Sequence, residues 1–403
     1  MLIKMTESPG KTTVYDPLTE TFSFRTAKRI LFGLNTCQDI GKEIKVLGGK
    51  RPLIVSDKGI LSSGVLDGVI DHVEGEGLNV EIFNDLTTEP TIESMQEAIK
   101  FVRRIECDVI VGVGGGSSMD TAKIVAIMKT NHGQLSDYFQ KPFENTRLPL
   151  VLVPTTAGTG SEVTGDAVLF VNGKKRWLAD SKLLPDAAVV DPLLSVTMPP
   201  RITASTGSDA LCHAVEAMMT TRSNPLSDTL ALKAIELITQ NIERAYNMGK
   251  DVMARYNMML AATIAGIASE NASCTLPHSV GYTLAFRYKL PHGISCAIAL
   301  PYAMKFNLPL FEEKCLSISS KMGLKTEGLT RREGALKAIK AIKSLMVRLD
   351  VPSSLKEIGV PENQLKELAE EFLTEYPRPY NIREVNRKNI LDLYEEIWKG
   401  DMN

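Results

Sequence analysis

Short apolar runs alternate with amphipathic stretches through the first half of the chain. Runs such as PLIV and LPLVLV lack polar alternation, which is typical of parallel strands buried on both faces. Strands are predicted at 52–55, 79–83, 108–113, 148–153 and 187–190. Because helical patterns separate these runs, the first half is predicted to be a parallel sheet covered by helices.

Two of the intervening stretches have clear helical periodicity. They are TIESMQEAIKFVRRI at 91–105 and SSMDTAKIVAIMK at 117–129. Thr91 and Ser117 stand at their starts, where a hydroxyl can accept a hydrogen bond from a free N–H group of the first turn. Both residues are therefore predicted to be helix N-caps.

The pattern changes at the double proline, Pro199 and Pro200. Beyond it the periodicity is helical and no convincing strand follows. Helices are predicted at 203–222, 225–248, 251–270, 309–322, 331–349, 363–375 and 387–399. Since proline interrupts regular elements, the sequence predicts a Rossmann-like α/β domain over 1–199 and an all-helical domain over 200–403. Residues 1–20 look like an extension before the first core strand.

Charge and composition narrow the class of protein. The 403 residues are 44% hydrophobic and 23% charged, with a formal net charge of -2, which is ordinary for a globular chain. No dense run of lysine and arginine is present, so neither a nucleic acid nor a membrane surface is an expected partner.

Hydropathy and cysteine usage indicate the compartment. No uninterrupted apolar stretch approaches the ~18 residues of a membrane span, and the polar N-terminus lacks the apolar segment of a secretory signal. The six cysteines are dispersed along the chain, which is typical of free thiols in a reducing compartment. A cytoplasmic protein is expected.

A glycine-rich turn follows the predicted strand at 108–113. In DVIVGVGGGSSMDT, Gly112, Gly114, Gly115 and Gly116 separate this strand from a helix. Glycines allow a phosphate to approach the backbone, and the free N–H groups of a helix start attract its charge. The turn departs from G-x-G-x-x-G because Ser117 takes the last glycine position. It is interpreted as a dinucleotide pyrophosphate site; a tight turn without a ligand is the alternative.

Two other segments favour a dinucleotide. Asp57 follows the strand at 52–55, where a carboxylate can bond the adenosine ribose and repel a 2′-phosphate. This position favours NAD over NADP, although a plain helix cap is an equally good interpretation. The loop at 154–164, PTTAGTGSEVT, also follows a strand and carries hydroxyl groups suited to phosphate, ribose and nicotinamide. A polar surface loop is its alternative.

Candidate metal ligands occur in the helical half. Asp209 and His213 are four residues apart and so share one helix face, while His278 and His292 each follow a proline. One such histidine is more often a core residue, but three with an aspartate indicate a site for Fe²⁺ or Zn²⁺. The ion would act as a Lewis acid on an alcohol or carbonyl oxygen.

Three cysteines lie near these positions in the sequence, and each is a possible additional ligand. They are Cys212, Cys274 and Cys296. Packing in the core is the expectation for all three.

Taken together, these motifs resemble the iron-containing (group III) alcohol dehydrogenase family. The similar segments, in the family's order, are FRTAKRILFG (24–33), GVGGGSSMDTAK (112–123), PTTAGTGSEVT (154–164), LLPDAAVVDP (183–192), TASTGSDALCHAVEA (203–217) and HSVGYTLAFRYKLPHG (278–293). The resemblance implies a Rossmann-like domain, a helical domain, and a metal and cofactor in the cleft between them. Dehydroquinate synthase has the same architecture.

The resemblance also assigns residues. It places Asp209, His213, His278 and His292 on the family's metal ligands, Fe²⁺ by preference and Zn²⁺ as an alternative. The positions that resemble its NAD-binding residues are Asp57, Gly114, Gly115, Gly116, Ser117, Asp120, Thr155, Thr156, Thr159, Ser161 and Lys175. Where many members carry a second substrate-facing histidine, this chain has Tyr282, which either relays a proton or lines the pocket.

The implied activity is reversible hydride transfer between an alcohol and NAD, with a small alcohol or aldehyde as substrate. The implied assembly is a homodimer or higher homo-oligomer. Two other activities use the same fold: a hydroxyacid-oxoacid transhydrogenase that retains its nicotinamide, and a lyase resembling dehydroquinate synthase. A non-catalytic nucleotide-binding protein is the remaining alternative, which the complete ligand set disfavours.

Overall fold

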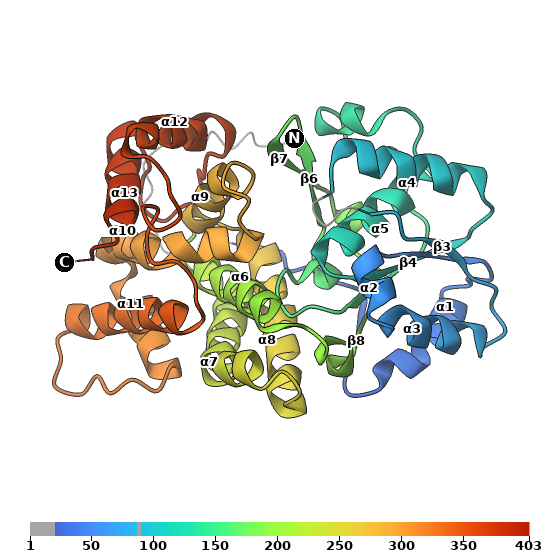
Figure 1. Cartoon of the computed structure of the whole chain (residues 1–403), viewed down its shortest axis with the longest axis horizontal. Helices are drawn as coiled ribbons and strands as arrows, with labels where there is room; N and C mark the ends of the chain where they lie inside the picture. The colour runs from blue at the N-terminus through green and yellow to red at the C-terminus, as the bar shows by residue number, and fades with distance from the viewer. Residues whose placement is uncertain (1–20, 87–89, 403) are drawn as a thin grey trace.

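The structure, a computed structural model, describes residues 21–86 and 90–402. An α/β half and a helical half lie side by side along the long axis of the molecule (Figure 1). The predicted fold class is therefore confirmed. The predicted N-terminal extension, residues 1–20, lies outside the described residues.

A parallel sheet of six strands forms the centre of the α/β half, in the order β1-β8-β5-β4-β2-β3. Its strands are β1 (Arg29–Phe32), β2 (Pro52–Val55), β3 (Glu81–Phe83), β4 (Val109–Gly114), β5 (Leu150–Pro154) and β8 (Ala187–Val190). Every residue of β2, β4, β5 and β8 is buried, which explains their continuous apolar runs. The five predicted strands are confirmed, whereas β1 was not foreseen.

Helices cover both faces of this sheet (Figure 1). They are α1 (Ile40–Val46), α2 (Lys58–Ser62), α3 (Val65–Glu74), α4 (Ile92–Arg104) and α5 (Gly116–Met128). Residues of α1 and α3 share one apolar cluster with the strands, and residues of α4 and α5 share another. The sheet therefore has a separate apolar core on each of its faces.

The two predicted N-caps have different outcomes. The Thr91 hydroxyl accepts a hydrogen bond from the Ser94 N–H group, and Ser94 reciprocates, so the first prediction is confirmed. The prediction for Ser117 is wrong. Helix α5 begins at Gly116, and the extended backbone of Gly115 takes the N-cap position without any side-chain bond.

A β-hairpin absent from the sequence prediction follows the second glycine-containing loop. Strands β6 (Asp166–Val171) and β7 (Lys174–Ala179) pair antiparallel. They are joined by Asn172 and Gly173, both with positive φ. This Asn-Gly pair is the turn signature of a two-residue hairpin, so the signal was present in the sequence. The hairpin carries Lys175 and Asp166 to the site described below.

The second half of the chain is helical. Its helices are α6 (Pro200–Met218), α7 (Pro225–Asn247), α8 (Val252–Ala272), α9 (Leu276–Ala285), α10 (His292–Lys321), α11 (Arg331–Arg348), α12 (Leu365–Glu375) and α13 (Arg387–Lys399). Pro199 is the N-cap of α6, and Pro200 occupies its first turn, where the missing N–H group costs nothing. The division into domains at 199/200 stays a prediction.

Helix α10 is longer than expected, and the predicted helix at 309–322 is only its second half. Pro301 and Pro309 lie inside it. Each proline removes one helical hydrogen bond, but most of the helix is buried and its packing offsets that loss. Among the described residues, α10 is the one helix long and apolar enough to cross a bilayer. Its most apolar window is 83% buried inside the molecule, as in a core helix.

Candidate metal and cofactor site

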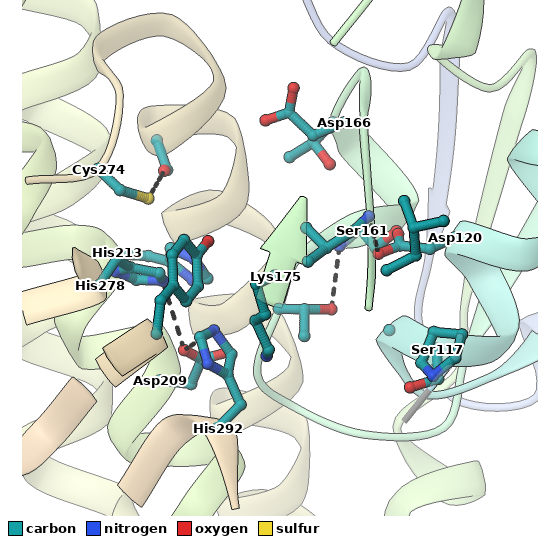
Figure 2. Close-up of a pocket in the computed structure, with 18 of the residues that line it drawn as sticks. Ser117, Asp120, Ser161, Asp166, Lys175, Asp209, His213, Cys274, His278 and His292 are labelled. Atoms are coloured by element: carbon teal, nitrogen blue, oxygen red, sulfur yellow. Dashed lines mark hydrogen bonds and ion pairs between the residues drawn. The ribbon is translucent and has the colours of Figure 1, made fainter. Parts of the chain in front are cut away.

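Three helices bring the four predicted metal ligands together. Asp209 and His213 lie on α6, His278 in the first turn of α9, and His292 is the first residue of α10. Figure 2 shows the four side chains gathered on the helical side of one cavity. Three helices that are separate in the sequence thus supply one cluster, and only the packing of these helices brings the four side chains together.

The distances between these donors are those of a cation site. Asp209 Oδ1 lies 3.7 Å from His278 Nε2 and 3.8 Å from His292 Nε2, too far for hydrogen bonds. Metal bonds of roughly 2.1 Å at a tetrahedral angle separate two ligand atoms by about 3.4 Å. Asp209 Oδ1 and His278 Nε2 are buried and have no hydrogen-bond partner among the described residues. A buried polar group without a partner costs about 1–3 kcal/mol, and a bound cation would remove that cost. The donor set therefore fits a divalent cation.

His213 belongs to a second, overlapping group of donors. Its ring stacks on that of His278 at 4.6 Å between centroids, and its Nδ1 is also buried without a partner. Donor atoms within 4.8 Å of one another form two sets that share His278. One set is Asp209, His278, His292 and Cys296, and the other is His213, Cys274 and His278.

Glu216, which sequence reasoning missed, orients His278. Its Oε1 lies 2.6 Å from His278 Nδ1, and its Oε2 accepts the Thr275 N–H group. Burial alone would raise the pKa of this carboxyl, but His278 holds it below its usual value. With Nδ1–H donating a hydrogen bond to the Glu216 carboxylate, Nε2 would be left to bind a cation. Its place on α6, seven residues after Asp209, was a signal available in the sequence.

His292 is held in the neutral form that metal binding requires. Burial and the neighbouring Lys175 ammonium lower its pKa well below the usual value. A neutral imidazole has a free lone pair at neutral pH, so no proton competes with a cation for this ligand.

A cavity of about 200 Å³ joins these ligands to the α/β half. Figure 2 shows the metal-ligand candidates on one side and Ser117, Asp120 and Ser161 on the other. Its lining comes from α5, from the loop after β5, from the hairpin and from α6, α8, α9 and α10. Both halves of the chain are needed to enclose it.

The glycine turn forms a cradle that side chains would fill. Gly114 has a φ of +145°, and a Cβ there would meet Ser118 Oγ at 2.5 Å. A Cβ on Gly116 would meet Thr159 Cγ2 at 2.8 Å, and one on Gly115 would touch Thr156. No side chain among the described residues caps the thirteen-residue helix α5, and the start of a helix attracts a phosphate. This arrangement fits a dinucleotide pyrophosphate.

The second loop packs beside the first. Thr155 is 2% exposed, and its hydroxyl has no hydrogen-bond partner among the described residues. Ser161 donates to Asp120 Oδ1 at 2.6 Å, and the Val168 N–H group donates to Asp120 Oδ2 at 2.9 Å. Asp120 therefore ties this loop and β6 to α5, which is a structural role beside the predicted cofactor contact.

Asp57 caps helix α2. Its Oδ1 accepts the N–H groups of Gly59 and Ile60, and its Oδ2 accepts the Ser118 hydroxyl. The structure thus shows the capping contact and places the carboxylate beside the glycine turn. The ribose contact stays a prediction.

Lys175 and Tyr282 lie where the two halves meet. The Lys175 ammonium is 5.5 Å from the centre of the Tyr282 ring. That ring stacks on His292 at 5.6 Å. Burial raises the pKa of Tyr282 above its usual value, so its phenol stays protonated at neutral pH.

Charged groups that no sequence motif pointed to lie at the other end of the cavity. Asp166, the first residue of β6, and Glu270 of α8 line it. Glu270 is paired with Arg25 at 2.6 Å and accepts the Gly165 N–H group. Burial and the nearby Glu270 raise the pKa of Asp166 to about 7. The fully buried Lys123 donates to the Asp166 carbonyl and to Thr164 Oγ1.

A dinucleotide cradle facing a cluster of three imidazoles and a carboxylate across one cavity defines a class: nicotinamide-linked, metal-dependent oxidoreductases. Comparison with known proteins identifies the family. Residues 27–192 match the profile of the iron-containing alcohol dehydrogenases, and residues 203–398 match that of the family's C-terminal domain. The chain belongs to the iron-containing alcohol dehydrogenase family and is an alcohol oxidoreductase that uses NAD and iron.

Individual relatives agree with this membership. The chain is 36% identical to the 1,3-propanediol dehydrogenase of Citrobacter freundii over 91% of its length and 96% of the relative. It is 35% identical to a choline dehydrogenase of Bacillus subtilis over 92% and 93%. The crystal structure of a 1,3-propanediol oxidoreductase superimposes with a TM-score of 0.91 at 34% identity, over 94% of this chain and 100% of that one. The NAD⁺ complex of sulfoacetaldehyde reductase from Bifidobacterium kashiwanohense has a TM-score of 0.85 at 27% identity, over 95% and 100%.

Proposed function

We propose that Asp209, His213, His278 and His292 hold the iron ion of this alcohol dehydrogenase. The observation that carries the proposal is the pair of orphaned donors, Asp209 Oδ1 and His278 Nε2, buried 3.7 Å apart. A bound iron supplies a Lewis acid for the substrate oxygen, and NAD accepts or supplies the hydride. Zn²⁺ is the alternative ion.

The cofactor is proposed to lie across the opposite wall. Gly114, Gly115, Gly116 and Ser117 would bind the pyrophosphate through the start of α5. The second loop, with Thr155, Thr156, Thr159 and Ser161, would bind the ribose and nicotinamide, together with Asp120 and Lys175. Support comes from the space that the glycines keep open and from the unpartnered Thr155 hydroxyl.

Asp57 is proposed to favour NAD over NADP. Its carboxylate lies beside the glycine turn, where it would repel a 2′-phosphate. Oδ1 already accepts two N–H groups, but Oδ2 accepts only the Ser118 hydroxyl, so Oδ2 can still accept a ribose hydroxyl.

Tyr282 is proposed to line the pocket and to hold the His292 ring in place. Its raised pKa makes it a poor base at neutral pH. The substrate proton would then leave through solvent or a cofactor ribose hydroxyl.

The substrate is proposed to be a small alcohol or its aldehyde. The curated relatives include 1,3-propanediol and choline dehydrogenases, which favours this reading over the transhydrogenase and lyase alternatives. Turnover without added free NAD would indicate a transhydrogenase instead. A homodimer is the proposed assembly, which sedimentation measurements would test. A cytoplasmic location is proposed from the free cysteines.

The central test replaces one metal ligand. His278→Ala should remove both iron retention and NADH-dependent reduction of short aldehydes, because it deletes the donor shared by both groups. Elemental analysis and absorbance at 340 nm, both without oxygen, measure the two effects. His132→Ala is the matched control, since that side chain is exposed. Full turnover by the His278→Ala protein without bound metal would contradict the assignment.

A further inference from the structure

One end of the cavity is acidic and takes no part in the proposed metal and cofactor sites. Asp166 and Glu270 line this end. In Figure 2 Asp166 lies apart from the metal-ligand candidates on one side and from Ser117 on the other. The acidic end is therefore the place for the part of a substrate that is remote from its reacting oxygen.

The Asp166 carboxylate has no partner of opposite charge. The residue is only partly buried, and no hydrogen bond or ion pair joins its side chain to any residue that the structure describes. The ammonium of Lys123 donates instead to the Asp166 carbonyl and to Thr164 Oγ1. Its ion pair is with Asp120, at 3.7 Å. Since Lys123 is fully buried in these contacts, the Asp166 carboxylate is left for a ligand.

Glu270 contributes a second hydrogen-bond acceptor at this end. Its side chain is only 1% exposed, and its Oε2 accepts the Gly165 N–H group. Its Oε1 is buried and receives no hydrogen bond from the described residues, although Arg25 Nε lies 2.6 Å away as an ion pair. Two carboxylates can thus accept hydrogen bonds from donors that the described chain does not supply.

The unpaired carboxylate resists ionisation in its present surroundings. Burial and the nearby Glu270 raise the pKa of Asp166 to about 7. Asp120 and Cys274 raise this pKa further, whereas Lys123 opposes them. A cationic ligand beside the carboxylate would favour its ionised form. Titratable groups that are perturbed in this way and line a cavity are typical of functional sites.

We propose that Asp166 determines specificity by pairing with an ammonium group at the far end of the substrate, which is then a short amino alcohol or its amino aldehyde. A primary ammonium has three N–H donors and one positive charge, which match the two acceptors and the unpaired carboxylate. The inference rests on the proposed function, because it takes the reacting oxygen to lie at the proposed metal ligands. There the alcohol carbon loses a hydride to NAD⁺ and its hydroxyl proton leaves, while the ammonium is unchanged.

Other groups at the far end of a substrate match the cavity less well. A carboxylate would lie against two acids of the same charge and be repelled. A hydroxyl group has a single donor and no charge, so it satisfies only one of the two acceptors. An apolar chain end would bury both carboxylates without a partner, which is unfavourable.

Alcohols of matched size test the proposal. Amino alcohols with two to five carbons and a terminal amine are compared at pH 8 with 1-alkanols that have the same number of non-hydrogen atoms. At this pH the amine is protonated and Asp166 is mostly ionised. Since a hydrogen bond to a charged group corresponds to roughly a 10–100-fold change in affinity, at least one amino alcohol should exceed its alkanol about tenfold in kcat/KM. Ratios near one or lower for every pair would overturn the proposal.

Asp166→Asn removes the charge and preserves the size of the side chain. The ratio of kcat/KM between amino alcohol and alkanol should fall to about one, mainly through a higher KM for the amino alcohol, because a binding contact is lost. Asp67→Asn is the matched control, since that side chain is exposed on α3, and it should keep the ratio of the unmodified protein. A preference for the amino alcohol that survives Asp166→Asn would overturn the proposal.

Binding of n-butylammonium supplies a readout that requires no turnover. In calorimetric titrations of the full-length protein with bound NADH, the unmodified protein should bind this cation about tenfold more tightly than Asp166→Asn does. Equal affinity would overturn the proposal. If the affinities differ but no alcohol is oxidised, the proposed function fails and this inference stands. If alkanols are oxidised without any preference for an ammonium, the inference fails and the proposed function stands.

Discussion

At the scale of single residues, the carboxylate of Glu216 orients one of the proposed metal ligands. It is fully buried and accepts a hydrogen bond from the Nδ1–H group of His278. Replacing it with glutamine preserves size but removes the charge that orients the imidazole. Glu216→Gln is expected to weaken iron retention roughly 10–100-fold, as measured by the rate of iron loss to a chelator. Glu97→Gln, at an exposed site on α4, is the control and should change nothing.

Asp166 gives the stability of the protein a specific pH dependence. Its pKa is about 7 in the folded chain, against an ordinary value of 3.8 for an aspartate side chain. Because the folded state holds this proton more tightly, the residue destabilises the fold progressively as pH rises from about 4 to 7. Asp166→Asn should therefore stabilise the protein at pH 8 by no more than about 4 kcal/mol, the free energy of the whole shift.

Urea unfolding at pH 8 and pH 4 measures this effect. At pH 4 the side chain at position 166 is neutral in the folded state whether it is aspartate or asparagine. The difference in unfolding free energy between the two proteins should therefore largely disappear. An Asp166→Asn gain that is equal at the two pH values would contradict the assignment of the shift.

At the scale of elements, Gly160 sets how closely the second cofactor loop approaches helix α8. Its φ is +63°, and a Cβ there would lie 2.5 Å from Gly266 Cα. Gly160→Ala should destabilise the fold and weaken NADH binding, because backbone atoms of α8 would have to move. Gly323, with a φ of +70° and nothing within 4 Å, is a control for the conformational cost alone.

That comparison separates strain from steric overlap. Gly323→Ala should cost about 1–2 kcal/mol of unfolding free energy, the usual penalty of a left-handed alanine. Gly160→Ala should cost roughly 1–3 kcal/mol more. Equal losses in denaturant unfolding would show that the loop and α8 are not in tight contact.

At the scale of the whole molecule, the halves are joined by polar contacts around the cavity. Lys174 and Arg176 of the hairpin both pair with Glu375 of α12. Thr263 of α8 donates to Glu162 of the second loop at 2.8 Å. These contacts hold the two walls of the cavity at a set separation, which a hydride transfer between cofactor and substrate requires.

Metal removal should therefore lower the stability of the entire chain. A cation at one hundred times its dissociation constant stabilises the folded state by about 2.7 kcal/mol. In a chain of 403 residues the melting temperature should then fall by roughly 3 °C when the metal is chelated. Calorimetry with and without chelator measures the shift. His278→Ala should show none, and an equal shift in that variant would place the cation elsewhere.

The sequence alone predicted the elements whose signals are local. Strand β2 and helix α13 were predicted with their observed bounds, because continuous apolar burial and helical periodicity are properties of neighbouring residues. The i,i+4 pair of Asp209 and His213 was readable for the same reason. Helix α10 was truncated in the prediction, because tertiary packing there overrides the local effect of Pro301 and Pro309.

Only the tertiary structure decided which side chains meet. His278 and His292 reach Asp209 because α9 and α10 pack on α6, and no periodicity encodes that approach. The same packing placed Glu216 behind His278 and Cys274 beside it. The sequence thus determined the classes of chemistry present, whereas the distances that join them into a site depend on contacts between residues far apart in the chain.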